Sequence, residues 1–246
     1  MSRVALITGA SRGLGECIAR RLHAAGYRVG LSDVRPEGVQ QLAAELDSSG
    51  ATAVAIELDV RNKADFQRAR DLLAERWGGT DILVNNAGVS KVAALMEITP
   101  EEFDESMAIN LRGTFVACQV FGAHFAERGF GRIVNIASLA GQNGGTATGA
   151  HYAAAKGGVA TLTKVFAREL APQGVTVNSI SPGPQDLPVV RESVAPERLE
   201  QILKMIPTGA LGNPEFIADS VLLLIADNAT SVTGACLDVN GGLFMR

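Results

Sequence analysis

Tyr152 and Lys156 lie four residues apart in the run His-Tyr-Ala-Ala-Ala-Lys-Gly-Gly, and only alanines separate them. Residues at this spacing share one face of a helix, so we expect the phenol and the ammonium to be neighbours. A phenol with an ordinary pKa of about 10 is a poor acid or base at neutral pH, and a nearby positive charge should lower that pKa. The pair is a candidate general acid–base, although the spacing alone is also common in solvated helical pairs.

His151 directly precedes the tyrosine and is a further titratable side chain in this run. Consecutive helical residues point about 100° apart around the axis, so His151 should not share the face of Tyr152. We expect His151 at the surface or in contact with a lid, without a catalytic role.

Three glycines, Gly9, Gly13 and Gly15, follow the apolar run 4–7 and open a segment of helical periodicity at 18–25. Gly9 would allow a tight turn, Gly13 a close approach of the backbone to a pyrophosphate, and Gly15 close packing of helix on strand. The N-terminus of the helix would supply free N–H donors to the anion. The spacing is Gly-x-x-x-Gly-x-Gly and not Gly-x-Gly-x-x-Gly, and a simple strand-to-helix turn is the alternative.

Seven apolar runs alternate with segments of helical periodicity along the chain. We expect strands at 4–7, 28–32, 52–58, 82–85, 132–137, 176–180 and 235–239. The alternation predicts one parallel sheet with helices on both faces, an α/β doubly wound (Rossmann-type) fold of seven strands. Right-handed crossovers favour the strand order 3-2-1-4-5-6-7, with a ligand at the carboxyl ends of the strands.

The 246 residues, 47% of them hydrophobic, suffice for one large core. No linker or internal repeat divides the chain, so we expect a single domain over residues 1–246. The main irregular stretch is the proline-rich segment 182–214, in which only residues 197–204 show a helical pattern. Irregular segments of this length are often functional, and we interpret residues 184–213 as a substrate lid.

The net charge of −4 leaves no basic surface for nucleic acid, and no run of lysine or arginine points to a membrane surface. No apolar run approaches the roughly twenty residues that span a bilayer, and no leader with an apolar stretch precedes the first strand. Cys17, Cys118 and Cys236 lack metal-ligand spacing and are expected as buried reduced thiols. These features favour a cytoplasmic protein without a bound metal that acts on small molecules.

Several motifs resemble those of the short-chain dehydrogenase/reductase family, in the family's order and over essentially the whole chain. The segment 8–15 is similar to Thr-Gly-x-x-x-Gly-x-Gly, 85–88 to Asn-Asn-Ala-Gly and 182–183 to Pro-Gly. The resemblance implies a nicotinamide dinucleotide bound at these motifs, with Asp33 on the adenosine ribose and Asp59 on the adenine. The implied cofactor-binding residues are Gly9, Ser11, Arg12, Gly13, Leu14, Gly15, Asp33, Asp59, Val60, Asn86, Ala87, Gly88, Tyr152, Lys156, Pro182 and Gly183.

The resemblance also implies four catalytic residues, Asn110, Ser138, Tyr152 and Lys156. Ser138 would hydrogen-bond the substrate oxygen, and Tyr152 would exchange a proton with it. Lys156 would lower the pKa of the phenol and hold the nicotinamide ribose. Asn110, in the helical region 99–127, would organise a water leading from Lys156 to solvent, which is compatible with a kink or a buried hydrogen bond there. The implied reaction is NAD(P)-dependent hydride transfer between nicotinamide and a secondary alcohol or ketone.

Two segments depart from the family pattern. Residues 141–149 form a stretch about one residue longer than usual and rich in glycine, which leaves the shape of the substrate pocket open. Leu187 stands where many members have a threonine that binds the nicotinamide carboxamide. We expect that contact from backbone groups or from Gln185.

The resemblance includes 3-oxoacyl-[acyl-carrier-protein] reductases, which tend to present basic residues to an acidic carrier protein. Arg128 could serve in this way, but Gln173 occupies a place where a second positive charge is expected. We therefore favour a small or medium-sized secondary alcohol or ketone, with the acyl reductase as the alternative. A dinucleotide-sensing protein without turnover is a third interpretation, which the intact Tyr–Lys pair disfavours.

The helical regions 100–128 and 150–171 are apolar on more than one face, so we expect one face to pack against another subunit. Family members commonly pair these helices in tetramers, and the resemblance implies a homotetramer. We also expect residues 243–246 at a subunit contact.

The charge of Asp33 predicts NAD over NADP, because a carboxylate close to a 2′-phosphate repels it. Arg12 and Arg35 could offset this repulsion. Val34 follows Asp33 at the position where NADP-using members often have arginine. The prediction is therefore NAD, with NADP as the alternative.

Overall fold

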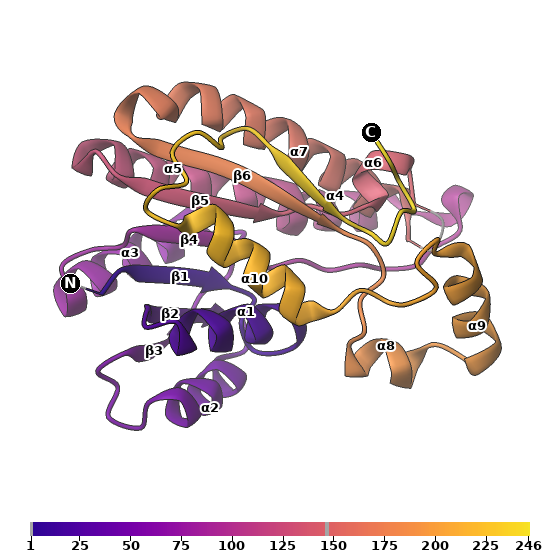
Figure 1. Ribbon diagram of the computed structural model, residues 1–246, viewed down its shortest axis with the longest axis horizontal. Helices are drawn as coiled ribbons and strands as arrows, with labels where there is room; N and C mark the ends of the chain where they lie inside the picture. Colours follow the sequence, from indigo (N-terminus) through magenta and orange to yellow (C-terminus); the bar gives the residue numbers. More distant parts are fainter. Residues whose placement is uncertain (1, 146–147) are drawn as a thin grey trace.

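The computed structural model describes residues 2–145 and 148–246, which form seven parallel strands in one sheet (Figure 1). The strands are β1 (Val4–Thr8), β2 (Arg28–Asp33), β3 (Ala53–Glu57), β4 (Ile82–Asn85), β5 (Gly131–Ile136), β6 (Val175–Pro182) and β7 (Cys236–Val239). Their order, β3-β2-β1-β4-β5-β6-β7, is the predicted one. The doubly wound α/β fold is therefore confirmed.

Helices cover both faces of the sheet. One face carries α1 (Gly13–Ala24), α2 (Pro36–Leu46) and α10 (Pro214–Ile225). The other carries α3 (Lys63–Trp77), α5 (Gly113–Arg128) and α7 (Ala150–Leu170). In β1, Ala5 and Ile7 face the first set of helices, Val4 and Leu6 face the second, and all four are buried. A strand covered on both faces must be apolar on both, which explains the uninterrupted apolar run.

The helical region 99–127 is not one continuous α-helix. It begins with α4 (Pro100–Met107), whose N-terminus is a capping box in which Thr99 and Glu102 bond reciprocally to each other's backbone amides. A π-helical turn, Ala108–Arg112, then separates α4 from α5. Such a turn places one extra residue in the helix and leaves the chain helical on both sides, so the region was predicted as one helical segment.

The segment between β6 and α10 contains two helices, α8 (Pro188–Ser193) and α9 (Pro196–Met205), at the lower right of Figure 1. The helical pattern at 197–204 corresponds to α9, whereas the sequence pattern does not predict α8. Short helical pieces elsewhere are Leu95–Glu97, α6 (Ala140–Asn143) and Ala171–Gln173. Among the described residues, no helix has the length and apolar character needed to cross a membrane.

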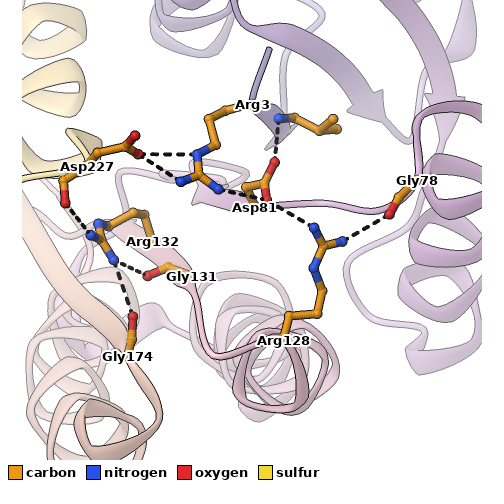
Figure 2. Close-up of polar contacts among 9 residues, drawn as sticks. Arg3, Gly78, Asp81, Arg128, Gly131, Arg132, Gly174 and Asp227 are labelled. Atoms are coloured by element: carbon orange, nitrogen blue, oxygen red, sulfur yellow. Dashed lines mark hydrogen bonds and ion pairs between the residues drawn. The ribbon is translucent and has the colours of Figure 1, made fainter. Parts of the chain in front are cut away.

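A buried arginine connects segments at the amino-terminal ends of the strands (Figure 2). Arg132 in β5 is 2% exposed, and its guanidinium donates to the carbonyl oxygens of Gly131, Gly174, Ala226 and Asp227. Two guanidinium groups lie over the Phe130 ring, that of Arg132 at 4.4 Å and that of Arg3 at 3.6 Å from its centroid. Arg132 therefore joins β5, the turn before β6 and the end of α10.

Candidate active site

The loop between β1 and α1 holds the three predicted phosphate-binding glycines. Gly9 has a φ of 66°, and a Cβ there would lie 2.8 Å from the Cα of Ala87. A Cβ on Gly15 would collide with the carbonyl oxygen of Gly9. On Gly13, which has a φ of 62°, a Cβ would meet only the tip of Leu187, at 4.0 Å. Gly9 and Gly15 thus permit close packing, and Gly13 presents backbone at the N-terminus of α1, where free N–H groups attract an anion.

A groove of about 730 Å³ starts at this loop and follows the carboxyl ends of β1 to β4. The predicted cofactor-binding residues that line it are Gly9, Ser11, Arg12, Gly13, Leu14, Gly15, Asp33, Asp59, Val60, Asn86, Ala87 and Gly88. The other lining residues are Glu16, Val34, Arg35, Leu58, Arg61, Val89, Glu105, Ile109, Leu187, Pro188 and Glu192. These residues either follow the end of a strand or belong to segments that cover the strand ends. Their position relative to the predicted strands could therefore have identified them from the sequence.

Asn86 connects the end of β4 to the glycine loop. Its Nδ2 donates to the carbonyl oxygens of Thr8 and Gly9, each at 3.0 Å. The Thr8 hydroxyl accepts from the backbone amides of Asn86 and Ala87, also at 3.0 Å. These reciprocal bonds fix the two chain segments that form the floor of the groove.

Asp33 is the last residue of β2 and is 8% exposed. One carboxylate oxygen accepts from the Ser11 hydroxyl at 2.6 Å, and the other accepts from the Arg35 amide at 3.0 Å. The Arg35 guanidinium lies 3.7 Å from the carboxylate, while its side chain remains more than half exposed. The negative charge therefore stays at the strand end, beside the glycine loop.

Asp59 lies two residues after β3 and is paired with Arg61. The Arg61 Nε lies 2.9 Å from both carboxylate oxygens. These hydrogen bonds hold the pKa of Asp59 below its usual range, although partial burial acts in the opposite direction. Val60 follows Asp59 and packs against Gly113 at the start of α5, where a Cβ would approach the valine to 3.0 Å.

Ser138, Tyr152 and Lys156 come together where β5 ends and α7 begins. Lys156 is buried, and its Nζ donates to the Ile136 carbonyl oxygen at 2.6 Å and lies 5.7 Å from the centroid of the Tyr152 ring. Burial lowers the pKa of Lys156 to about 8. Burial also raises the pKa of Tyr152, and a hydrogen bond with Ser138 offsets part of the rise. The expected net lowering of the phenol pKa is therefore wrong for this arrangement, because desolvation dominates.

Asn110 is fully buried in the π-helical turn. Its amide donates to the carbonyl oxygens of Val89 and Ser106, and its Oδ1 accepts from the Val89 amide at 2.9 Å. A Cβ on Gly88 would lie 2.8 Å from the Asn110 Oδ1 and 3.6 Å from the Lys156 Nζ. Asn110 and Lys156 therefore meet around Gly88, and the predicted buried hydrogen bond of Asn110 is confirmed.

Pro182 and Gly183 end β6 beside the serine segment, because the Leu139 amide donates to the Pro182 carbonyl oxygen at 2.9 Å. Gln185 is buried, and its Nε2 donates to the Gly183 carbonyl oxygen at 3.1 Å. Its Oε1 is buried without a hydrogen-bond partner among the described residues. Leu187 instead lies over Gly13 and lines the groove.

The expectation that His151 lies at the surface or against a lid is wrong, since the side chain is only 2% exposed. Its ring folds back over Gly149, where a Cβ would collide with it, and the Gly149 amide donates to the Lys91 carbonyl oxygen at 3.0 Å. The chain that follows β4 therefore covers the first turn of α7. In the segment 141–149, whose length we singled out, Thr146 and Ala147 lie outside the described residues.

Arg128 does not flank the candidate site. It donates to the Gly78 carbonyl oxygen at 3.1 Å and pairs with Asp81 at 3.3 Å, at the amino-terminal edge of the sheet (Figure 2). Gln173 lies in the short helix after α7 and is exposed. Neither residue offers a positive charge beside Ser138 and Tyr152.

The last residues of the chain contact their own subunit. Arg246 pairs with Asp238 at 2.8 Å, and the Asn240 amide donates to the Phe244 carbonyl oxygen at 3.1 Å. Met245 is 75% exposed, so part of this tail is available to a partner.

Similarity to known proteins extends over the full chain. Residues 9–244 match a family model described as enoyl-(acyl carrier protein) reductase. The chain is 38% identical to D-threitol dehydrogenase of Mycolicibacterium smegmatis, over 99% of this chain and 94% of the relative. It is 40% identical to acetoacetyl-CoA reductase of Rhizobium meliloti, over 99% of both chains, and 37% identical to 3-oxoacyl-[acyl-carrier-protein] reductase of Vibrio cholerae, over 99% and 98%. A crystal structure of a short chain dehydrogenase from Bacillus anthracis is similar with a TM-score of 0.89 and 30% identity, over 99% of this chain and 97% of that chain.

Proposed function

The chain belongs to the short-chain dehydrogenase/reductase family of NAD(P)-dependent oxidoreductases, and we propose that Tyr152 is the general acid–base of its alcohol–ketone interconversion. The observation that carries this proposal is the meeting of Ser138, Tyr152 and Lys156 beside the dinucleotide groove. The dinucleotide, when bound, supplies or accepts the hydride. The protein positions the substrate oxygen and moves its proton.

During ketone reduction, the Ser138 hydroxyl donates a hydrogen bond to the substrate oxygen, and the Tyr152 phenol gives that oxygen its proton. The raised pKa of Tyr152 keeps the phenol protonated at neutral pH, which suits a proton donor. In the oxidation direction, Tyr152 must accept the proton as phenolate. The charged form of Lys156 favours that phenolate through space.

The proton of Tyr152 must be replaced after each reduction. Asn110 and Lys156 meet around Gly88, and the lowered pKa of Lys156 lets it gain and lose a proton near neutral pH. We assign to Asn110 the role of holding a water that connects Lys156 with solvent. Its amide and carbonyl groups are held by Val89 and Ser106, so its orientation is fixed.

The residues of the groove fit a dinucleotide, because Gly13 presents open backbone at a helix N-terminus and Asp33 ends β2. We propose that NAD is the preferred form. Asp33 keeps its charge at the strand end, where it can accept from ribose hydroxyls and repel a 2′-phosphate. Arg12 and Arg35, which also line the groove, are the features that favour the NADP alternative.

We propose a secondary alcohol or ketone of small or medium size as the substrate. The names of two relatives, D-threitol dehydrogenase and 3-oxoacyl-[acyl-carrier-protein] reductase, mark the two main possibilities. Arg128 is bonded at the opposite edge of the sheet, which removes the basic residue that favoured a carrier-protein substrate. The third interpretation, a sensor without turnover, is disfavoured by the complete set of Ser138, Tyr152 and Lys156.

The predicted homotetramer is supported by a second groove, of about 1000 Å³, on the face formed by α4, α5 and α7. Its apolar lining residues are Met107, Ala108, Leu111, Phe115 and Leu162. Phe115 and Val165 are 37% and 45% exposed on this face. A second copy of the chain would remove this apolar area from water.

We further propose that residues 1–246 form a single domain in which residues 184–213, including α8 and α9, act as the substrate lid. The cytoplasm remains the proposed location. Cys17, Cys118 and Cys236 are free, and burial raises the pKa of Cys118 to about 12, which makes this thiol inert. The expectation of three buried thiols is correct only for Cys118, since the other two are partly exposed.

A screen of polyols, hydroxy acids, steroids and acyl thioesters, with NAD and NADP in parallel, tests the proposed function through the absorbance of the reduced nicotinamide. We expect turnover of a small alcohol or ketone that is lost in Tyr152→Phe. Turnover of acyl-carrier-protein thioesters alone would support the alternative. Dinucleotide binding without turnover of any substrate class would support the sensor.

A further inference from the structure

Three polar side chains form a hydrogen-bonded chain beneath the candidate site. The Asn85 Nδ2 donates to the Asn135 Oδ1 at 2.8 Å, and the Asn135 Nδ2 donates to the Thr163 Oγ1 at 3.0 Å. The Thr163 hydroxyl in turn donates to the Val159 carbonyl oxygen at 2.9 Å. These hydrogen bonds link β4 to β5 and β5 to α7.

These side chains lie in an otherwise apolar layer. Asn85 and Asn135 are neighbours in the register of β4 and β5, and they follow Leu83 and Ile133 on the same face of the sheet. Asn85, Asn135 and Thr163 are at most 5% exposed. Burying amides here is unfavourable unless each is paired, so the arrangement specifies one position of α7 on the sheet.

Cys118 of α5 completes the surroundings of the two amides. Its Sγ lies 3.5 Å from the Asn85 Nδ2 and 3.8 Å from the Asn135 Oδ1. A buried thiol is a weak partner, so the strong link between the sheet and α7 is the bond from Asn135 to Thr163.

The same stretch of β5 also holds the catalytic lysine. Ile136, which follows Asn135, accepts from the Lys156 Nζ. Residues 152, 156, 159 and 163 lie on one stripe of α7, so Thr163 is two turns beyond Lys156 on the same face. Two consecutive residues of β5 therefore bind α7 at two points, one through a side chain and one through a backbone carbonyl.

We propose that Asn135 and Thr163 are positioning residues that act through Lys156. The Asn135–Thr163 bond sets how far α7 extends past the end of β5, and that distance places the Lys156 ammonium between the Ile136 carbonyl oxygen and the Tyr152 ring. This inference rests on the proposed role of Lys156 in holding the nicotinamide ribose. It goes beyond that role because it assigns a function to residues that touch neither cofactor nor substrate.

The experiment is a double-mutant cycle on dinucleotide binding, measured by calorimetry, which needs no substrate. Thr163→Val removes the hydroxyl with little change in shape, and we combine it with Lys156→Met and, separately, with Asp33→Asn. Thr163→Ser keeps the hydroxyl and serves as the conservative variant. Thr176→Val is the matched control, because Thr176 is buried and its hydroxyl has no hydrogen-bond partner among the described residues.

We expect Thr163→Val to weaken dinucleotide binding about fivefold in the wild-type and Asp33→Asn backgrounds, a size typical of coupled residues. In the Lys156→Met background the effect should disappear, because the group through which Thr163 acts is gone. Thr163→Ser and Thr176→Val should bind as the wild type does. The kcat of Thr163→Val should fall on the order of tenfold, because reacting groups are sensitive to small displacements.

An equal effect of Thr163→Val with and without Lys156 would overturn the inference. It would mean that the Asn135–Thr163 hydrogen bond supports protein stability and does not act through Lys156. Wild-type affinity in a folded Thr163→Val variant would overturn it as well. A wild-type protein that binds neither NAD nor NADP would instead overturn the proposed function, and this inference with it.

Discussion

The Lys156 ammonium bonds to the Ile136 carbonyl oxygen at 2.6 Å and lies 5.7 Å from the centroid of the Tyr152 ring. The lysine is therefore attached to the neighbouring strand, and its charge reaches the phenol through space. Burial, and not that charge, sets the direction in which the pKa of Tyr152 moves. The position of Lys156 thus depends on β5 as well as on its own helix.

Tyr152→Phe should abolish turnover while it leaves dinucleotide binding nearly unchanged, because it removes one hydroxyl that acts on the substrate. Acid–base groups contribute roughly 10²–10⁴-fold to the rate. Steady-state kinetics and calorimetry on the same preparation measure both effects. A folded Phe variant whose rate stays within about threefold of the wild type would contradict the assignment.

Lys156 should make protein stability depend on pH. Its pKa falls from an ordinary 10.5 to about 8 on folding, so between these values the unfolded chain binds more protons than the folded protein does. Stability therefore rises with pH across this window, by up to roughly 3 kcal/mol for the fully buried group. Below pH 8 Lys156 is charged in the folded protein, and the full cost of burying that charge lowers the free energy of unfolding.

Urea unfolding of the wild type and of Lys156→Met, at several pH values across that window, measures this contribution as the difference between the two proteins. The difference should change in favour of the wild type as the pH rises. Parallel curves for the two proteins would show that Lys156 does not lose its proton in the window.

Asp33→Asn should shift preference towards NADP, since it removes the charge that repels a 2′-phosphate. Repulsion on the order of 1–3 kcal/mol corresponds to a tenfold to hundredfold change in the ratio of kcat/KM values for the two cofactors. Glu37→Gln, an exposed charge removal in the first turn of α2, is the control and should leave the ratio unchanged. A wild-type enzyme that clearly prefers NADP would mean that Arg12 and Arg35 dominate.

Phe115→Glu should dissociate the assembly, because it places a charge in the apolar groove between α4, α5 and α7. Leu72→Glu is the matched control, since Leu72 on α3 has a similar exposure, 38%, and lies outside that groove. Light scattering at micromolar concentration should give a smaller mass for the first variant only. A wild-type monomer would contradict the proposed homotetramer.

The sheet could be predicted because each strand is a short, continuous apolar run between helical segments, and parallel crossovers leave few possible orders. The polar residues at the strand ends, such as Asp33 and Asn86, were identified from their place after a strand together with the resemblance to the family's motifs. The π-helical turn at Asn110 was not predicted, because the residues on both sides of it are helical and the segment was assigned as one helical region.

Two properties of the site depend on contacts between distant segments, which sequence patterns do not report. His151 is buried because residues near Lys91, some 60 positions earlier in the chain, cover it. The pKa of Tyr152 is raised and not lowered because burial desolvates the phenol, and a hydrogen bond with Ser138 offsets only part of the rise. Local spacing identified the candidate catalytic pair, but it did not identify Ile136 as the hydrogen-bond partner of the lysine.

The hydrogen bonds between Arg132 and the surrounding carbonyl groups should be insensitive to ionic strength. Screening by salt weakens attractions between exposed ions, but the hydrogen bonds of this guanidinium go to backbone dipoles in a buried space. The candidate site lies at the opposite edge and includes exposed ion pairs such as the one between Arg61 and Asp59. Salt should therefore affect ligand affinity while the link that Arg132 makes between β5, the turn before β6 and the end of α10 stays unchanged.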